Sequence, residues 1–152
     1  MTVIFDRRQV LMSSLGAIAV AGWIGGVGPA QAANDSADLI KAFTGGKSAA
    51  EGRVKIDMPE IAENGNTVPM TISVDSPMTE QSYVQDVLVV ADGNPRGGVV
   101  AFHFTPMSGV AEANTRIRLA NSQKITAVAR MNDGSFFTAS KDVKVTIGGC
   151  GG

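Results

Sequence analysis

The stretch that decides the fold of this chain is Lys124-Ile125-Thr126-Ala127-Val128-Ala129-Arg130-Met131-Asn132-Asp133-Gly134-Ser135. Its first part, Lys124 to Met131, is a largely apolar run that predicts a β-strand. The next residues, Asn132-Asp133-Gly134, indicate a tight hairpin, because an Asp-Gly pair tolerates positive φ at both central positions of the turn. The residues from Ser135 to Ala139 then predict a strand that returns beside the first.

The same signals recur on both sides of this hairpin. Apolar and polar residues alternate from Val54 to Met58 and from Thr67 to Val74, where Pro69 indicates a strand start or a sheet edge. The other predicted strands are Tyr83–Ala91, Gly98–Phe104, Thr115–Leu119 and Lys141–Ile147. Turn residues separate the runs at Asn64-Gly65-Asn66, Asp92-Gly93-Asn94-Pro95 and Asn121-Ser122.

One short helix is predicted ahead of the strands. Ser36 is expected to cap it, Leu39, Ile40 and Phe43 fall on one face, and Gly45-Gly46 should end it. About seven or eight short strands at spacings near ten residues, with almost no other helix, favour an all-β antiparallel β-sandwich over residues 33–147.

The amino terminus has the pattern of an export signal. Arg7-Arg8 precede an apolar stretch from Val10 to Val27, and the small residues Ala30-Gln31-Ala32 follow. We therefore expect residues 1–32 to be a cleaved signal peptide of the twin-arginine type, which directs folded proteins to the bacterial periplasm. An uncleaved membrane anchor is disfavoured, because several glycines and serines dilute a stretch that is barely long enough to span a bilayer.

The charge of the chain excludes one class of partner. The formal net charge is −1, and it becomes about −2 when residues 1–32 are removed. No basic patch remains that could neutralise a phosphate backbone, so we expect no nucleic-acid partner. No second apolar span follows the signal, so no membrane association is expected after processing.

The carboxyl terminus, Gly148-Gly149-Cys150-Gly151-Gly152, holds the only cysteine of the chain. Glycine has no Cβ and adopts unusual dihedral angles at little cost, so residues 148–152 are expected to form a flexible C-terminal arm. From Ile147, three extended residues would carry the thiol roughly 10 Å from the last predicted strand. The pattern indicates a thiol that is presented to other molecules.

The residue types of the chain argue against metal and catalytic chemistry. Closed zinc and blue-copper sites need several His or Cys ligands, whereas this chain has one histidine and one cysteine. The histidine, His103, lies between Phe102 and Phe104 in opposite pleat phase, which is typical of the less buried face of a sheet. Thiol catalysis needs a fixed base and nearby positive charge, and the arm provides neither. We therefore expect no catalytic residue, metal or other cofactor.

A lone exported thiol cannot close a disulfide within its own chain. Its available states are an intermolecular or mixed disulfide, a persulfide or an oxidised acid. Persulfides and thiosulfonates suit a carrier, because their S–S bond holds sulfur covalently and can be attacked again.

Four stretches of the chain resemble the SoxY family, the sulfur-carrier subunits of the bacterial thiosulfate-oxidising (Sox) system. The resemblance extends over essentially the whole processed chain. The stretches are Met58–Asn66, Ser76-Pro77-Met78-Thr79-Glu80, Thr115-Arg116-Ile117-Arg118-Leu119-Ala120 and the Gly-Gly-Cys-Gly-Gly terminus.

The resemblance implies an immunoglobulin-like β-sandwich that pairs with SoxZ as a heterodimer. It implies that SoxAX couples thiosulfate oxidatively to the arm cysteine, that SoxB removes the sulfone group as sulfate, and that SoxCD oxidises the remaining sulfur where it is present. Carried onto this sequence, the covalent attachment residue is Cys150, and Gly148, Gly149, Gly151 and Gly152 form the carrier arm.

Two other functions remain open at this point. The first is an exported interaction module in which Cys150 makes only a structural intermolecular disulfide. The second is a thiol oxidoreductase or peroxidase, which is disfavoured because the chain lacks a second cysteine and a base.

Overall fold

The computed structural model of the chain describes residues 34–148, and two β-sheets make up most of this range. One sheet has the order β2 (Val54–Asp57), β4 (Val68–Val74), β7 (Ala111–Ile117). The other has the order β1 (Ala50–Glu51), β9 (Phe136–Ile147), β8 (Gln123–Met131), β5 (Val84–Ala91), β6 (Gly98–His103), and β3 (Ile61–Asn64) also pairs with β9. A 3₁₀ turn, η1 (Pro106–Ser108), connects the two sheets.

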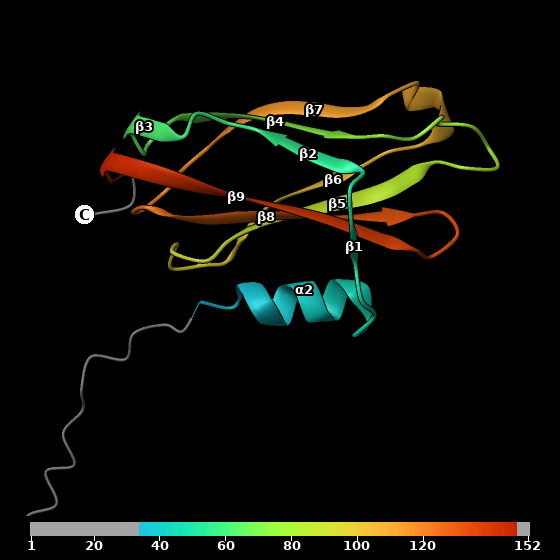
Figure 1. The fold of residues 1–152 in the computed structure, drawn as a ribbon, viewed down its shortest axis with the longest axis horizontal. Coiled ribbons are helices and arrows are strands. Elements are labelled where there is room, and N and C mark those ends of the chain that lie inside the picture. The colour runs from blue at the N-terminus through green and yellow to red at the C-terminus, as the bar shows by residue number, and fades with distance from the viewer. Residues whose placement is uncertain (1–33, 149–152) are drawn as a thin grey trace, which may run out of the picture. The chain divides into compact units, whose positions relative to one another are not determined.

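The sheets pack face to face, and their alternating apolar residues form the core between them (Figure 1). In β4 the buried residues Val68, Met70, Ile72 and Val74 alternate with residues that are more exposed. This period of two puts every second side chain on the inner face, as the sequence predicts. Each fully buried aliphatic side chain contributes about 1.5–3 kcal/mol by leaving water. The ladders between the core strands are all antiparallel.

The hairpin predicted from the sequence joins β8 to β9. The amide of Gly134 donates to the carbonyl of Met131 at 3.0 Å, and Gly134 has a φ of 79°, a conformation that glycine adopts without strain. Asp133 accepts from both the hydroxyl and the amide of Ser135. These hydrogen bonds favour the carboxylate and lower the pKa of Asp133 below its ordinary value.

Helix α2 (Ser36–Thr44) covers the outer face of the larger sheet (Figure 1). Phe43 packs edge-on against Phe136 of β9, with the ring centroids 5.9 Å apart. The helix ends at Gly45 in a left-handed conformation, as predicted. The prediction that Ser36 caps the helix is wrong, because Asp35 occupies the N-cap position and Ser36 instead donates its amide to the side chain of Asn34.

The predicted β-sandwich is confirmed, and three details differ from the sequence prediction. The runs Ser135–Ala139 and Lys141–Ile147 form a single strand, β9, because Ser140 continues the ladder opposite Thr126. Strand β7 spans Ala111–Ile117, whereas the sequence predicts a strand over Thr115–Leu119. Pro69 lies at the start of β4, as one of its two predicted roles requires, and β4 has a partner on one side only at this position because β2 ends opposite Thr71. Strands β1 and β3 were not predicted, and both pair with β9 in parallel.

Several chain segments meet at one end of the sandwich. Figure 1 shows that the end of β9, strand β3, the β7–β8 link and the β5–β6 turn all lie there, together with the start of α2. Among the residues that the structure describes, no helix is long and apolar enough to cross a membrane.

Candidate functional site: the base of the C-terminal arm

The residues predicted to carry the function lie at the carboxyl terminus, and only the first of them is described. Cys150, Gly149, Gly151 and Gly152 lie outside the described residues, as does the predicted signal peptide 1–32. Gly148 is the last described residue. The site that the structure describes is therefore the set of contacts that hold Ile147 and Gly148, at the start of the predicted arm.

The last residue of β9 is held by the β3–β4 turn. The carbonyl of Ile147 accepts a hydrogen bond from the amide of Gly65 at 2.7 Å, and Ile147 stands opposite Asn64 in the parallel ladder. The side chain of Asn64 accepts the amide of Asn66 at 2.9 Å and so stabilises the turn. The end of the strand is thereby fixed up to its final residue.

Gly65 also connects this turn to the β7–β8 link. Its carbonyl accepts a hydrogen bond from the amide of Leu119 at 2.8 Å, and its own amide donates to the carbonyl of Ile147. Leu119 is fully buried in the core, so it anchors the link. One residue thus couples the end of β9 to the segment that follows β7.

Gly148 passes directly over this link. A Cβ placed at Gly148 would lie less than 3.0 Å from the carbonyl oxygen of Ala120, a separation that real Cβ atoms do not adopt. A glycine is therefore required at the first position of the arm unless Ala120 moves.

Asn94 in the β5–β6 turn holds Ala120 in place. Its side-chain amide donates to the carbonyl of Arg118 at 2.9 Å, and its side-chain oxygen accepts the amide of Ala120 at 2.9 Å. The same oxygen accepts from Gln123, which in turn accepts the amide of Gly93 at 2.8 Å. Asn94 therefore ties the β5–β6 turn to both ends of the Arg118–Ala120 segment.

Two of the stretches that carry the resemblance meet at this base. Asn64-Gly65-Asn66 supplies the turn against Ile147, and Arg118-Leu119-Ala120 supplies the link against Gly148. The sequence identifies both stretches and marks Asn94 as a turn residue, but no pattern in it predicts that they touch the arm. The role of Asn94 was missed for this reason.

His103 lies away from the arm base, on the outer face of the larger sheet. Its side chain is 78% exposed, and its Nδ1 is 2.5 Å from Oδ1 of the mostly buried Asp86. Asp86 also pairs with Arg130 across the β5–β8 ladder. The guanidinium of Arg130 in turn lies over the ring of Phe43, so this cluster joins the sheet to α2.

Within residues 34–148, no group of three or more His, Cys, Asp or Glu side chains is placed to hold a metal ion.

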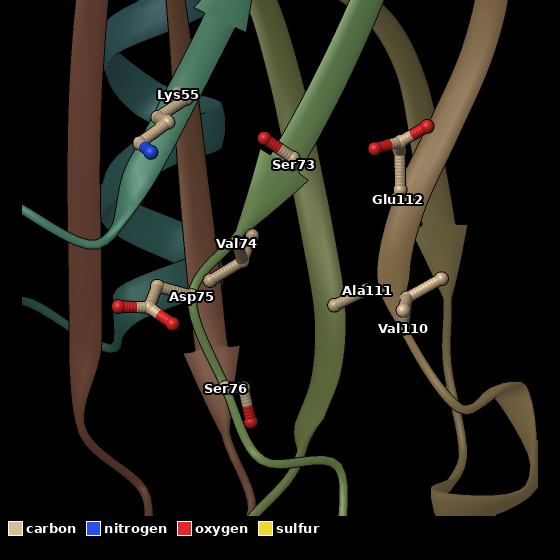
Figure 2. A pocket seen from close by; sticks show the side chains of 8 residues that line it. All are labelled: Lys55, Ser73, Val74, Asp75, Ser76, Val110, Ala111 and Glu112. Atoms are coloured by element: carbon tan, nitrogen blue, oxygen red, sulfur yellow. The ribbon is translucent and has the colours of Figure 1, made fainter.

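An open hollow lies at the end of the smaller sheet where β4 finishes and β7 begins, and Figure 2 shows Lys55, Asp75 and Glu112 around it. The arm base lies at the other end of β4, beyond Val68, so this hollow does not contribute to it.

The fold and site define an immunoglobulin-like β-sandwich whose last strand leads directly into a glycine- and cysteine-containing terminus. Residues 40–150 match the family model of the sulfur oxidation protein SoxY. The chain belongs to the SoxY family. The resemblance expected from the sequence is thereby confirmed.

Solved structures agree with this assignment. The sulfur carrier protein SoxY from Chlorobium limicola f thiosulfatophilum superposes with a TM-score of 0.61 and 29% identity, covering 73% of this chain and 96% of that one. Superoxide reductases share the fold alone. The protein from Ignicoccus hospitalis has a TM-score of 0.55 at 19% identity, covering 62% and 80% of the two chains. The protein from Nanoarchaeum equitans has a TM-score of 0.54 at 12% identity, covering 63% and 100%. No curated protein sequence matches the chain.

Proposed function

We propose that this protein is a periplasmic sulfur carrier, in which Cys150 covalently holds sulfur derived from thiosulfate and presents it to the enzymes of thiosulfate oxidation. Membership of the SoxY family and the likeness to the Chlorobium sulfur carrier support a carrier that acts in sulfur oxidation. The attachment to Cys150, the arm 148–152 and the export of the chain belong to the proposal.

The construction of the arm base is the observation that carries the proposal. Ile147 is held by Gly65, and Gly148 passes Ala120 so closely that a side chain would not fit. Cys150 follows Ile147 by three residues, so its thiol can be presented within roughly 10 Å of a fixed strand end. A fixed base with a short glycine-rich extension suits a thiol that enters the active sites of other proteins.

In the proposed cycle the partner enzymes accept the electrons, and the atoms balance at each step on the Cys150 thiol. Coupling of thiosulfate to Cys150 forms one S–S bond and releases a proton and an electron pair, which the haem enzyme SoxAX accepts. Hydrolysis by SoxB breaks the bond between the outer two sulfur atoms, releases sulfate and leaves a persulfide. SoxCD, where present, accepts electrons from the outer sulfur of the persulfide while water supplies oxygen, which leaves a sulfonate on the Cys150 sulfur; a second hydrolysis then releases sulfate and restores the thiol. The chain itself is the carrier in this scheme and not an enzyme.

The proposal includes one stable partner and one cellular location. SoxZ is proposed to form the heterodimer, in keeping with the Sox-system context that the family implies. Residues 1–32 are proposed to direct export through the twin-arginine pathway. Because that pathway carries folded proteins, a partner without its own signal could be exported together with this chain.

Replacement of Cys150 by serine tests the proposal. In a system reconstituted with SoxZ and the Sox enzymes, C150S should abolish thiosulfate oxidation and leave the unfolding transition unchanged. A control variant, C150S combined with S108C, places a thiol on the exposed η1 turn, and it should not restore turnover. Retained turnover in C150S would refute the carrier assignment.

Intact mass separates the carrier from the interaction module. Protein purified without reductant should carry reducible sulfur or sulfonate additions on Cys150. Disulfide-linked dimer as the sole modified form, together with unaffected turnover in C150S, would instead identify the cysteine as a structural link.

A further inference from the structure

Two arginines line a hollow beside the arm base. Arg96 belongs to the β5–β6 turn and Arg118 directly follows β7. Together with Asn94, Pro95, Gly98 and Val99 they enclose a space of about 370 Å³ that opens to solvent. Both arginine side chains are exposed.

Neither arginine has an acidic partner among residues 34–148. The ion pair in this range joins Asp86 to Arg130, and Asp86 also shares a hydrogen bond with His103, on a different part of the molecule. Two carboxylates near the turn bind backbone amides and pair with neither arginine: Asp35 accepts a hydrogen bond from the amide of Gly97, and Asp92 accepts one from the amide of Lys124. The hollow therefore presents two guanidinium groups that form no ion pair within residues 34–148.

The hollow and the arm base share the same support. Asn94 lines the hollow and holds both the carbonyl of Arg118 and the amide of Ala120. Ala120 in turn contacts Gly148, two residues before Cys150. Two extended residues reach about 7 Å, and Arg118 is itself only two residues from Ala120. A group on Cys150 can therefore reach the arginines without any change in the sandwich.

We infer that the hollow between Arg96 and Arg118 is a docking site for the sulfonate of the loaded arm. This inference rests on the proposed function. A guanidinium group forms paired hydrogen bonds to planar or tetrahedral oxyanions, and two such groups complement the oxygens of a thiosulfonate. The free thiol and the persulfide carry no sulfonate, so the site distinguishes the arm that bears a sulfonate from the arm that does not.

The same oxyanion chemistry could come from three sources: the arm of the same molecule, the arm of a second copy, or free thiosulfate. The geometry favours the arm of the same molecule, because the tether keeps its sulfonate within reach at a high effective concentration. Docking of this kind should not depend on protein concentration and should weaken as salt screens the charges.

NMR spectroscopy of the full chain, isolated with whatever partner co-purifies, tests the inference. The thiolate of Cys150 is loaded with tetrathionate, which transfers a thiosulfonate to the sulfur and releases thiosulfate; intact mass reads the loading. We expect loading to shift the side-chain Nε–H signals of Arg96 and Arg118 and the amide signal of Gly98. The shift of the Gly98 amide should disappear in the double variant R96Q/R118Q, and all of these shifts should persist in R116Q, which removes an exposed arginine of β7 outside the hollow.

Three further samples identify the source of the anion. Alkylation of Cys150 with iodoacetamide adds a neutral group and should not produce the shifts. Free thiosulfate at the protein's own concentration should not produce them. Unlabelled loaded protein mixed with labelled C150S should leave the labelled signals unchanged.

Contrary results in these samples would refute the docking inference and would leave the proposed carrier function untouched. Shifts that are absent on loading, that survive in R96Q/R118Q, or that appear equally with the neutral adduct, free thiosulfate or the second copy would contradict the inference. The proposed function is judged separately by turnover of C150S, so the two failures are distinguishable.

Discussion

The carbonyl oxygen of Ala120 occupies the space that a side chain on Gly148 would need. Ala120 is held by Asn94, and Gly148 follows Ile147, which is held by Gly65. The requirement for glycine at position 148 thus comes from a contact with the β7–β8 link, which is distant in sequence, and not from the neighbouring residues of the chain. This relationship makes the arm base testable by substitution.

Replacement of Gly148 by alanine should displace the β7–β8 link. The added Cβ cannot coexist with the present position of Ala120, and overpacking of this kind typically costs about 1–3 kcal/mol. Urea unfolding should show the loss, and thiosulfate turnover should fall with it. The matched control is G149A, one residue further along the arm, which should unfold like the unsubstituted protein. Equal stability of G148A and G149A would contradict the close contact.

Replacement of Asn94 by alanine should loosen the support of the arm base. The variant loses three hydrogen bonds and leaves the amide of Ala120 without its partner, at a cost of about 1–3 kcal/mol. Hydrogen exchange at the Ala120 amide should become faster. The control N114A, which loses hydrogen bonds to Thr71 and Glu112 on the exposed face of β7, should leave hydrogen exchange at the Ala120 amide unchanged. Unchanged protection of Ala120 in N94A would show that another group holds the link.

Removal of Asp86 should weaken the attachment of α2 to the larger sheet. Asp86 pairs with both Arg130 and His103, and Arg130 contacts Phe43 of the helix. Because both partners are partly exposed, we expect D86A to cost about 1–3 kcal/mol, less than the loss of a fully buried pair. Protease cleavage within α2 should become faster. H103Q should leave both stability and thiosulfate turnover nearly unchanged; a loss of turnover in H103Q would assign His103 a role that its position does not suggest.

The β8–β9 hairpin should lose stability in acid. The hydrogen bonds from Ser135 lower the pKa of Asp133 below the ordinary value of 3.8. A lowered folded pKa means that the stabilisation is complete above the ordinary value and is lost as the pH falls through the folded value. An NMR titration of the Asp133 carboxyl carbon should show this, and S135A should move its midpoint upward. A midpoint at or above the ordinary value in the unsubstituted protein would contradict the prediction.

Most of the sandwich could be predicted because its strands carry their own signals. The alternation in β4 and the Asp133-Gly134 turn each depend on neighbouring residues alone. Strand β3 gave no such signal: it has four residues, its Ile61 is exposed, and its partner β9 lies about eighty residues away in sequence. Parallel pairing of a strand this short with a segment so distant in sequence leaves no local period to detect.

The candidate site could likewise be predicted only in part from the sequence. The arm could be recognised from composition, because Cys150 is the only cysteine and four glycines surround it. Its base could not, because Gly65, Asn94 and Ala120 meet Ile147 and Gly148 only through the folding of three separate turns. The predictions for Cys150 and for residues 1–32 stay predictions.

The pairing of β9 along both of its edges has a mechanical consequence. The strand has twelve residues and runs about 40 Å, with β8 bonded along one side and β3 along the other at its carboxyl end. A pull on the terminus along the strand axis loads these cross-strand bonds together, in shear, instead of opening them one after another. Under the carrier function proposed above, an enzyme that binds and releases the terminus would exert force on a strand that is bonded along both of its edges, and the sandwich should withstand repeated loading cycles without unzipping.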